Sequence, residues 1–383
     1  MILKRKGFIG QYLKHSFWAL SCILCLSVFG QDHHYTLVNL SPLRLNPALT
    51  GVFENDFRNK DIRFSSHYRD QWRSVNSQWT NYQTPFVTTS LGLDSQLKLH
   101  KIVRGDYAGW GVHLLYDQSG DLKLSSTDIA VNFAYHKVLN RAHNMYLSLG
   151  GSYTHTLRKI DYNQGVFDNQ WTGLAFDPSA ATGESFSISQ FNFEDYKAGA
   201  LFQYFPDYPF KFKIGYSLHH LNEPNQTFFL KDESNTLKLN NIFHGSLEYP
   251  LKNPKRSIIS NAFFQSQAAA NEFKIAAYYK FKIEEAHHVN QFLQFGLGMR
   301  QVGSWQKEID SEALYFAARY GYGDLIISLA YDTNVSGLVP ATNTIGAFEI
   351  SIIYYEDLFR KIKQPRKRPG EYRPKCPKPV RSF

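Results

Sequence analysis

Large apolar side chains alternate with small or polar ones along most of the chain after residue 60. Between Ala108 and Tyr116 every second residue is apolar, whereas intervening positions such as Gly109 and His113 are mainly small or polar. A period of two places the two sets on opposite faces of a β-strand. The polar run at 117–121 then predicts a tight reversal of the chain.

The same alternation recurs to the end of the chain, and no segment after residue 31 has a strong helical period. Lysines even alternate with apolar residues along whole strands, as at 210–220 and 272–282. The pattern predicts fourteen strands, an even number, at 62–70, 84–94, 107–117, 125–138, 145–158, 196–205, 210–220, 241–249, 257–266, 272–282, 291–302, 312–321, 324–333 and 344–355.

The length of these strands favours a membrane barrel over a water-soluble sandwich. Many of them run to about ten residues, which suits a tilted crossing of the hydrocarbon layer and exceeds the usual length of soluble strands. Aromatic residues gather at strand ends, as at Tyr107, Tyr135 and Tyr249, where the two interfaces of a membrane lie. We therefore expect an all-β, transmembrane outer-membrane β-barrel of about 14 antiparallel strands at 61–355.

Composition agrees with this fold class. The chain has 60 aromatic residues among 383 and only 20% charged residues, which excludes a disordered protein. The lengths of the connections also fit a barrel whose N-terminus starts in the periplasm. Long connections then lie outside and short ones inside, except for the basic connection 95–106; the outside set is 70–84, 159–195, 221–240, 303–311 and 334–343.

The first thirty residues have the features of a secretory signal peptide. Lys4, Arg5 and Lys6 form a charged start, residues 16–29 form an apolar run, and Gly30 offers a small residue for cleavage before Gln31. The apolar run is shorter than the roughly 20 residues that a membrane helix needs. We expect residues 1–30 to be removed and 31–60 to form an N-terminal periplasmic or plug-like segment.

Charge is concentrated at the two ends of the chain. Residues 356–383 hold ten basic and three acidic residues, whereas 31–355 hold 28 basic and 30 acidic ones. A nearly neutral body gives no sign of nucleic-acid binding. Five prolines among the basic residues of 356–383 disfavour strand pairing and predict an extended, basic C-terminal tail.

Signals for cofactors, metals and catalysis are weak. After signal cleavage Cys376 is the single cysteine, so no internal disulfide can form. Histidine pairs such as His219 and His220 sit next to each other on a predicted strand, where they point to opposite faces and cannot chelate one metal together. No spacing of Ser, His and Asp singles out a catalytic set. We expect no cofactor, no metal and no enzymatic activity.

Five motifs, in order along the chain, resemble the PorP/SprF family of type IX secretion system outer-membrane proteins. They are Asn46-Pro-Ala-Leu-Thr-Gly51, Tyr68-Arg-Asp-Gln-Trp72, Gly215-Tyr-Ser-Leu-His-His-Leu-Asn-Glu-Pro-Asn225, Tyr331-Asp-Thr-Asn-Val-Ser336 and Gly346-Ala-Phe-Glu349. The resemblance implies a component of the secretion and gliding machinery in the outer membrane. It also implies partners: outer-membrane lipid, periplasmic secretion-machine components and a secreted surface adhesin as client.

The residues of these motifs are the candidates for partner binding, and each also has a structural interpretation. Asn46, Pro47 and Gly51 suit a turn that delivers the N-terminal segment to the first strand. Arg69 and Trp72 suit an interfacial anchor, and Asp332 with Ser336 suits the last outer loop. Glu349 in the lumen needs a basic partner, for which Arg300 and Arg319 are candidates. The remaining candidates are Tyr68, Gln71, His220, Pro224, Asn225 and Tyr331.

Other functions stay open at this stage. A passive outer-membrane porin or a hydrophobic-substrate channel has the same strand pattern. A barrel enzyme is less well supported, because no residue spacing singles out a catalytic set. The tail has two interpretations, a docking arm for periplasmic secretion components or a solubility tail attracted to anionic material. An even number of strands returns the C-terminus to the side where the barrel began, which places the tail in the periplasm.

Overall fold

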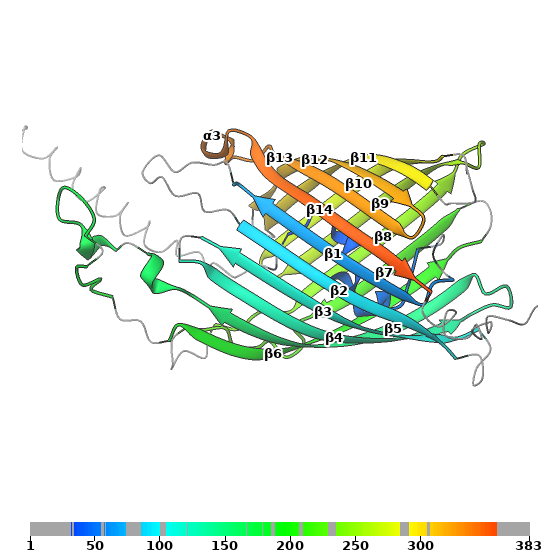
Figure 1. Ribbon diagram of the computed structural model, residues 1–383, viewed down its shortest axis with the longest axis horizontal. Coiled ribbons are helices and arrows are strands. Elements are labelled where there is room, and N and C mark those ends of the chain that lie inside the picture. The colour runs from blue at the N-terminus through cyan, green and yellow to red at the C-terminus, as the bar shows by residue number, and fades with distance from the viewer. Residues whose placement is uncertain are drawn as a thin grey trace, which may run out of the picture.

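The fold is a closed antiparallel β-barrel, seen in a computed structural model (Figure 1). The structure describes residues 32–357 apart from 33, 55–56, 58, 74–85, 100–104, 121, 166, 178, 185–187, 207–209, 229–234, 284–290 and 305–306. The signal peptide expected at 1–30 and nearly all of the tail expected at 356–383 lie outside the described residues. Among the residues described, no helix has the length and apolar character needed to cross a membrane.

Fourteen strands follow one another around the barrel, and the last pairs with the first. They are β1 (Ile62–Gln71), β2 (Phe86–Lys98), β3 (Tyr107–Ser119), β4 (Leu124–Val138), β5 (Met145–Lys159), β6 (Gln190–Tyr204), β7 (Lys211–His219), β8 (Asn240–Pro250), β9 (Arg256–Gln267), β10 (Ala270–Lys282), β11 (Gln291–Ser304), β12 (Lys307–Tyr322), β13 (Leu325–Asn334) and β14 (Ile345–Glu356). The predicted number of strands and the barrel are confirmed.

Strand ends differ from the prediction mainly at the end of the barrel that carries the long connections. β6 begins at Gln190 and β12 at Lys307, whereas we expected 196 and 312. The first residues of β6 include Asn192 and Glu194, which are exposed. Polar residues interrupt the apolar alternation there, so the sequence signal fades before the strand does. We call this the outer end, because long connections mark the extracellular side of such barrels.

The two faces of the wall have the predicted chemistry. On β4 and β5 the outward residues Phe133 and Leu149 are 62% and 60% exposed, while the inward residues Asn132 and Ser148 are fully buried. Exposed apolar residues that continue around a barrel face lipid, because hydrocarbon replaces the water that would otherwise oppose them. Ile214 and Phe295 also point outward, as expected.

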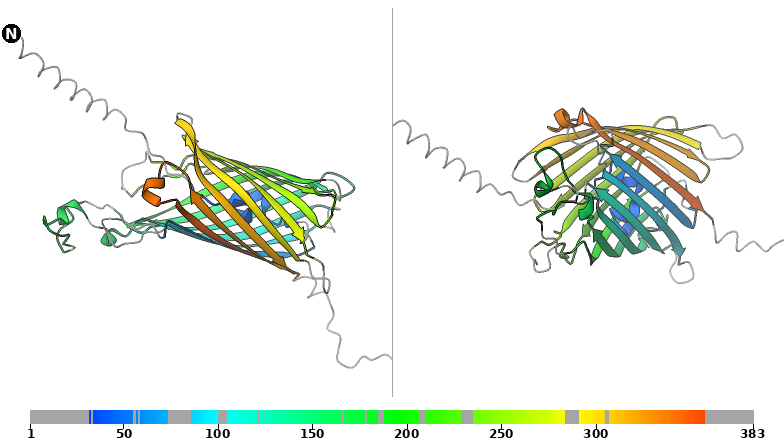
Figure 2. Two further views of the ribbon diagram at one scale, coloured as in Figure 1. Left: turned by 90° about the horizontal axis from the view of Figure 1, so that it is seen from above. Right: turned by 60° about the vertical axis from the view of Figure 1, so that its left-hand side comes forward.

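An N-terminal segment occupies the lumen, seen in blue inside the barrel in Figure 2. It contains three short helices, η1 (Val38–Leu40), α2 (Pro42–Leu45) and η2 (Pro47–Leu49). Pro42 and Pro47 each stand at the first helical position, where a missing N–H costs nothing. The side chain of Asn46 caps η2 by accepting a bond from the backbone N–H of Ala48.

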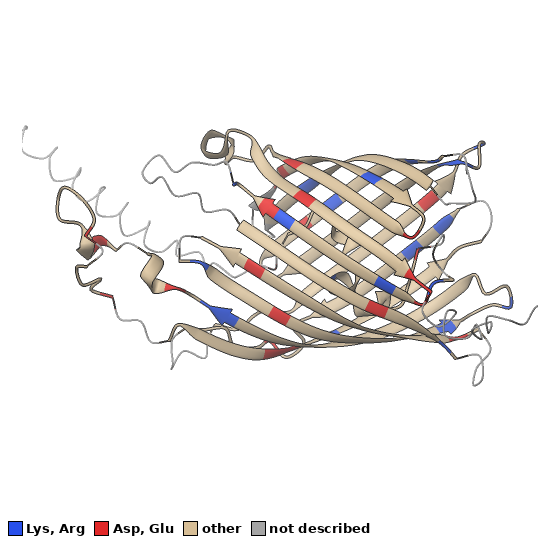
Figure 3. Ribbon diagram, viewed as in Figure 1, with Lys and Arg blue, Asp and Glu red and all other residues tan. Residues whose placement is uncertain are grey.

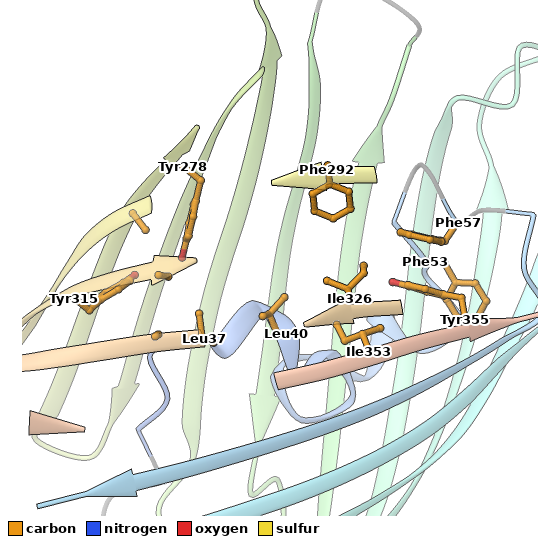
Figure 4. Close-up of a cluster of buried hydrophobic side chains, with 13 residues drawn as sticks. Leu37, Leu40, Phe53, Phe57, Tyr278, Phe292, Tyr315, Ile326, Ile353 and Tyr355 are labelled. Atoms are coloured by element: carbon orange, nitrogen blue, oxygen red, sulfur yellow. The ribbon is translucent and has the colours of Figure 1, made fainter. Parts of the chain in front are cut away.

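Apolar residues of this lumen segment pack against apolar patches of the wall. Figure 4 shows Leu37 and Leu40 facing a cluster to which Tyr278, Tyr315 and Ile326 belong. A second cluster joins Val38, Leu45 and Leu49 of the lumen segment to wall residues that include Leu201 and Phe263. The hydrophobic core of the protein therefore lies inside the barrel, between the lumen segment and the wall.

The remaining described helices lie in connections between strands. η4 (Tyr162–Gln164) and η5 (Asp168–Gln170) belong to the connection between β5 and β6, and α3 (Val339–Thr342) belongs to the connection between β13 and β14. Both connections lie at the outer end, on the left in Figure 1.

Candidate functional site

The lumen segment begins at the outer end, where Asp32 lies in a polar cluster. His220, directly after β7, places Nε2 3.1 Å from Asp32 Oδ1 and Nδ1 3.0 Å from Asp195 Oδ2. The side chain of Asn240 donates to Asp32 at 2.9 Å, and the backbone N–H of Asp32 donates to Gln267 at 2.9 Å. The described start of the chain and the end of β14 therefore lie at opposite ends of the barrel.

The charges of this cluster support one another. Burial by itself disfavours a charged imidazole, but the carboxylates of Asp32 and Asp195 outweigh it and raise the pKa of His220 to about 9. Burial likewise opposes the ionised carboxylate of Asp32, yet its attraction to His220 lowers the pKa of Asp32 well below its usual value. At neutral pH the cluster holds a protonated His220 between two carboxylates.

A second polar network holds the chain at Thr36 and Leu37. Their backbone N–H groups donate to the two oxygens of Glu349 at 2.6 and 2.7 Å. Arg69 donates to Glu349 and also to Asp332 at 3.2 Å. The hydroxyl of Thr36 donates to Asp332. All of these groups are buried, and one wall arginine pairs with both carboxylates that bind the lumen segment.

Neighbouring strands extend this network across the lumen. Arg300 Nη2 lies 3.0 Å from Asp332 Oδ2, and Arg300 Nε lies 2.6 Å from Glu312 Oε2. Lys274 pairs with Glu272 at 2.8 Å and donates to the backbone oxygen of Tyr35. Charged groups of β1, β10, β11, β12, β13 and β14 thus surround residues 34–37, and together with the Asp32 cluster they form what we call the outer anchor.

This network corrects three expectations for individual residues. The partner of Glu349 is Arg69, whereas Arg300 pairs with Asp332 and Glu312, and Arg319 bonds to Glu54. Arg69 is 3% exposed and faces the lumen, so it is not an interfacial anchor. Asp332 is buried in the same network and does not build the last outer loop.

Farther along, the chain from Asn46 to Gly51 lies directly on the wall. The Asn46 amide donates to the backbone oxygens of Ala200 and Tyr216 at 3.1 and 3.2 Å and lies 3.0 Å from His244 Nε2. Asn46 is fully buried and bridges β6, β7 and β8. It is not part of a turn into β1, which begins only at Ile62.

Wall glycines make this close approach possible, and we call them the glycine shelf: Gly109, Gly150, Gly199 and Gly215. A Cβ at Gly150 would lie 2.4 Å from the carbonyl carbon of Pro47, and one at Gly109 would lie 2.0 Å from the oxygen of Thr50. Such distances are shorter than real Cβ contacts, so Gly109, Gly150 and Gly199 require glycine while the lumen segment is in place. At Gly215 a Cβ would first meet His244 of the wall, at 2.2 Å, and then the Asn46 amide at 3.0 Å. The next residue, Gly151, faces outward and has only one atom nearby, at 3.9 Å.

The lumen segment leaves the glycine shelf at Gly51, whose φ of +76° requires glycine. Its N–H donates to Asp94 at 2.7 Å, and Asp94 in turn forms a two-bond pair with Arg63 at 2.9 and 2.7 Å. Arg63 also donates to the backbone oxygen of Val52 at 2.8 Å. A buried ion pair between β1 and β2 therefore fixes the point at which the segment leaves the shelf.

The other motif residues lie outside the outer anchor and the glycine shelf. Gln71 accepts a bond from Arg69 at 3.0 Å and borders the outer anchor. Trp72 has a φ of +61° and packs its ring edge-on to Phe86. Ser336 accepts from the N–H of Leu338 and shapes the last outer loop, as expected.

Four further motif residues lie on the outer wall surface or in an outer connection. Tyr68 and Tyr331 point outward, with Tyr331 48% exposed and the Tyr68 hydroxyl donating to Asp70 at 3.0 Å. Pro224 is buried and accepts from the N–H of Leu237, and Asn225 pairs with Thr236 within the connection between β7 and β8. The motifs thus combine lumen contacts with local loop structure.

Sequence reasoning did not single out Arg63, Asp94 or the glycine shelf. Glycines at inward positions of strands were a usable signal, because a strand glycine often marks the close approach of another backbone. The lumen also retains a cavity of about 190 Å³, lined by residues such as Leu37, Lys213 and Tyr278. Over the described ranges, no group of three or more His, Cys, Asp or Glu residues is arranged to hold a metal ion.

These features define an outer-membrane-type β-barrel whose lumen is occupied by its own N-terminal segment. Among solved structures, the chain is similar to BamA from Haemophilus ducreyi lacking POTRA domains 1-3, with 10% identity and a TM-score of 0.41 over 85% of this chain and 80% of that one. It is also similar to CdiB from Acinetobacter baumannii, with 7% identity and a TM-score of 0.40 over 77% and 60%. At these TM-scores the similarity does not bear on function.

The family follows from the sequence. Residues 27–354 match the model of the type IX secretion system membrane protein PorP/SprF, so the chain belongs to the PorP/SprF family. No curated protein matches significantly. Family and fold together make this protein an outer-membrane barrel component of the type IX secretion system.

Proposed function

We propose that this barrel supports the secretion or surface anchoring of a client adhesin, and that it does so without enzymatic activity. The observation that carries the proposal is the occupied lumen. Residues 34–54 are held by charged groups at the outer anchor and by the glycine shelf, and they lie in the space that a passing substrate would need. A client therefore meets the barrel on its outer or periplasmic surfaces.

The test compares a strain lacking this barrel with the same strain carrying the wild-type gene. Quantitative mass spectrometry of exported proteins in surface and medium fractions is the measurement. We expect one or a few exported proteins to leave the surface fraction in the deletion strain and to return with the wild-type gene. Unchanged fractions for every exported protein would refute the proposal.

A passive pore or a hydrophobic-substrate channel is the alternative function, and the occupied lumen disfavours it. We expect the purified barrel to show no steady open-pore conductance in a planar bilayer, because the lumen segment lies across the path of ions. A stable conductance of a size typical of general porins, together with altered uptake of small solutes by the deletion strain, would favour the channel instead.

For the periplasmic side, the proposed contact is the basic tail. Truncation at residue 360 is expected to leave barrel assembly intact and to lower co-purification of periplasmic secretion components. Ten basic residues without a strand pattern supply the attraction. Unchanged co-purification would leave the tail as a solubility element.

A further inference from the structure

The connection between β5 and β6 is the longest outer connection, thirty residues from 160 to 189. It projects beyond the strand ends at the outer end of the barrel (Figure 1). Its far part is a small hairpin, Trp171–Phe176, which we call the tip. Trp171 and Phe176 form an antiparallel bridge, and their ring centroids lie 5.0 Å apart.

Hydrogen bonds hold the tip in one conformation. The N–H of Thr172 donates to the oxygen of Ala175 at 3.0 Å, and Gly173 turns the chain with a φ of +91°. Behind the tip, the buried side chain of Gln170 accepts from the N–H of Phe167 and donates to the oxygen of Ala180. The tip is therefore preorganised, which lowers the entropy lost on binding.

The tip exposes a large apolar surface. Leu174 is 93% exposed, and Trp171 and Phe176 are about half exposed at 50% and 46%. Tryptophan is enriched among interface anchors, and a cluster of exposed apolar side chains rimmed by polar residues marks an interaction site.

Charge indicates what covers the tip. The connection has four acidic residues, Asp161, Asp168, Asp177 and Glu184, and no lysine or arginine. Figure 3 accordingly marks only acidic positions along its described part. Segments that insert into a membrane surface are rich in lysine and arginine, so this connection has the wrong charge for lipid.

A second copy of the chain is also a poor match. The other outer connections together hold four basic and four acidic residues, namely in 72–85, 120–123, 220–239, 268–269, 305–306 and 335–344. Their sum is neutral, so they offer no positive surface to the acidic connection. A separate protein whose contact face is basic around an apolar pocket would complement both the apolar tip and the acidic residues of the connection.

We propose that the tip docks into an apolar pocket, rimmed by basic residues, on the exported client protein that this barrel retains at the cell surface. The inference rests on the proposed function and specifies the client contact. Burying one exposed leucine is worth about 1.5–3 kcal/mol, so loss of the Leu174 side chain should weaken retention about tenfold or more.

The experiment uses the deletion strain complemented with wild type, Leu174→Ser, a triple variant (Trp171→Ser, Leu174→Ser, Phe176→Ser) or Leu338→Ser. Leu338 is the matched control, because it is an exposed leucine, at 52%, on another outer connection. Leu174→Ser cannot disturb folding through lost packing, since its side chain is almost fully exposed. Surface and medium fractions are compared by mass spectrometry, and a photo-crosslinking residue at position 174 captures the contact in intact cells.

We expect Leu174→Ser and the triple variant to release the same exported protein that the deletion strain releases, at least tenfold above wild type. Leu338→Ser should behave as wild type. Position 174 should crosslink to that same protein, and Glu184→Gln should weaken the crosslink.

If the deletion releases this protein but both tip variants retain it, the docking surface is wrong while the proposed function stands. If the deletion releases nothing, the proposed function itself fails. Crosslinks at position 174 only to lipid, or only to another copy of this chain, would also overturn the assignment.

Discussion

Two parts of the lumen segment are held by opposite chemistry. Residues 32–37 are bound by charged groups, with Glu349 receiving two backbone N–H groups and Arg69 neutralising it. Residues 46–51 are held by close fit and hydrogen bonds: the shelf glycines let the backbone lie against the wall, and Asn46 bonds to β6, β7 and β8. The first anchor should therefore respond to changes in charge, and the second to changes in volume.

The largest effect is expected from Arg69→Ala. It leaves Glu349 and Asp332 buried with one cation fewer, and removing one partner of a buried ion pair costs about 3–5 kcal/mol. Denaturant unfolding of the refolded barrel in lipid vesicles measures the loss. Tyr68→Phe is the control, since Tyr68 is the neighbouring residue and faces outward; equal losses would mean that the network does not hold the segment.

The next largest effect tests which face of the wall lies against lipid and which faces the lumen segment. Ile214→Arg, near the middle of β7, should cost about 2–4 kcal/mol in the same assay, because it places a charge in hydrocarbon. Lys213→Arg, one residue away and lining the lumen cavity, should cost little. Similar costs at both positions would contradict the assigned faces.

The dependence of the second contact on side-chain volume is tested by Gly150→Leu, with Gly151→Leu as the control. The first forces a side chain into Pro47 and should cost about 1–3 kcal/mol through overpacking. It should also raise the labelling rate of an Ala48→Cys probe, in a chain whose Cys376 is replaced by serine. The Gly151 variant faces outward and should match wild type in both measurements; a similar response from both variants would rule out the shelf.

The smallest effect concerns His220. Its pKa is raised to about 9 in the folded protein, so its contribution to stability is fully present below about 6.5 and disappears as the pH rises through 9. His220→Gln should therefore speed labelling of a Val38→Cys probe fewfold at pH 7, and the difference from wild type should vanish above pH 9. Labelling at Ala48 should not distinguish the two proteins. A difference at Val38 that persists at high pH would mean that His220 acts through packing.

Much of the barrel could be predicted from the sequence. Strand number, inward and outward faces and the location of long connections all follow from a period of two, which is a property of neighbouring residues. Ile214 and Phe295 were placed correctly on the lipid face for this reason. For the N-terminal segment, local patterns supported only the expectation of a periplasmic or plug-like segment, and its contacts could not be predicted.

Only the tertiary structure decided which charges meet. Arg69 and Glu349 are 280 residues apart and become direct cross-strand neighbours because β14 closes onto β1. Arg300 and Arg319 were reasonable partners for Glu349 by sequence proximity, yet closure placed Arg69 nearer.

The path of the lumen segment was likewise invisible to local patterns. Asp32 lies at the outer end because His220, Asn240 and Gln267 converge there from three strand ends. Asn46 reaches three strands at once because wall glycines let its backbone approach. A local period determines which way a side chain faces in the wall, whereas only closure of the barrel around its own N-terminal segment determines what that side chain meets.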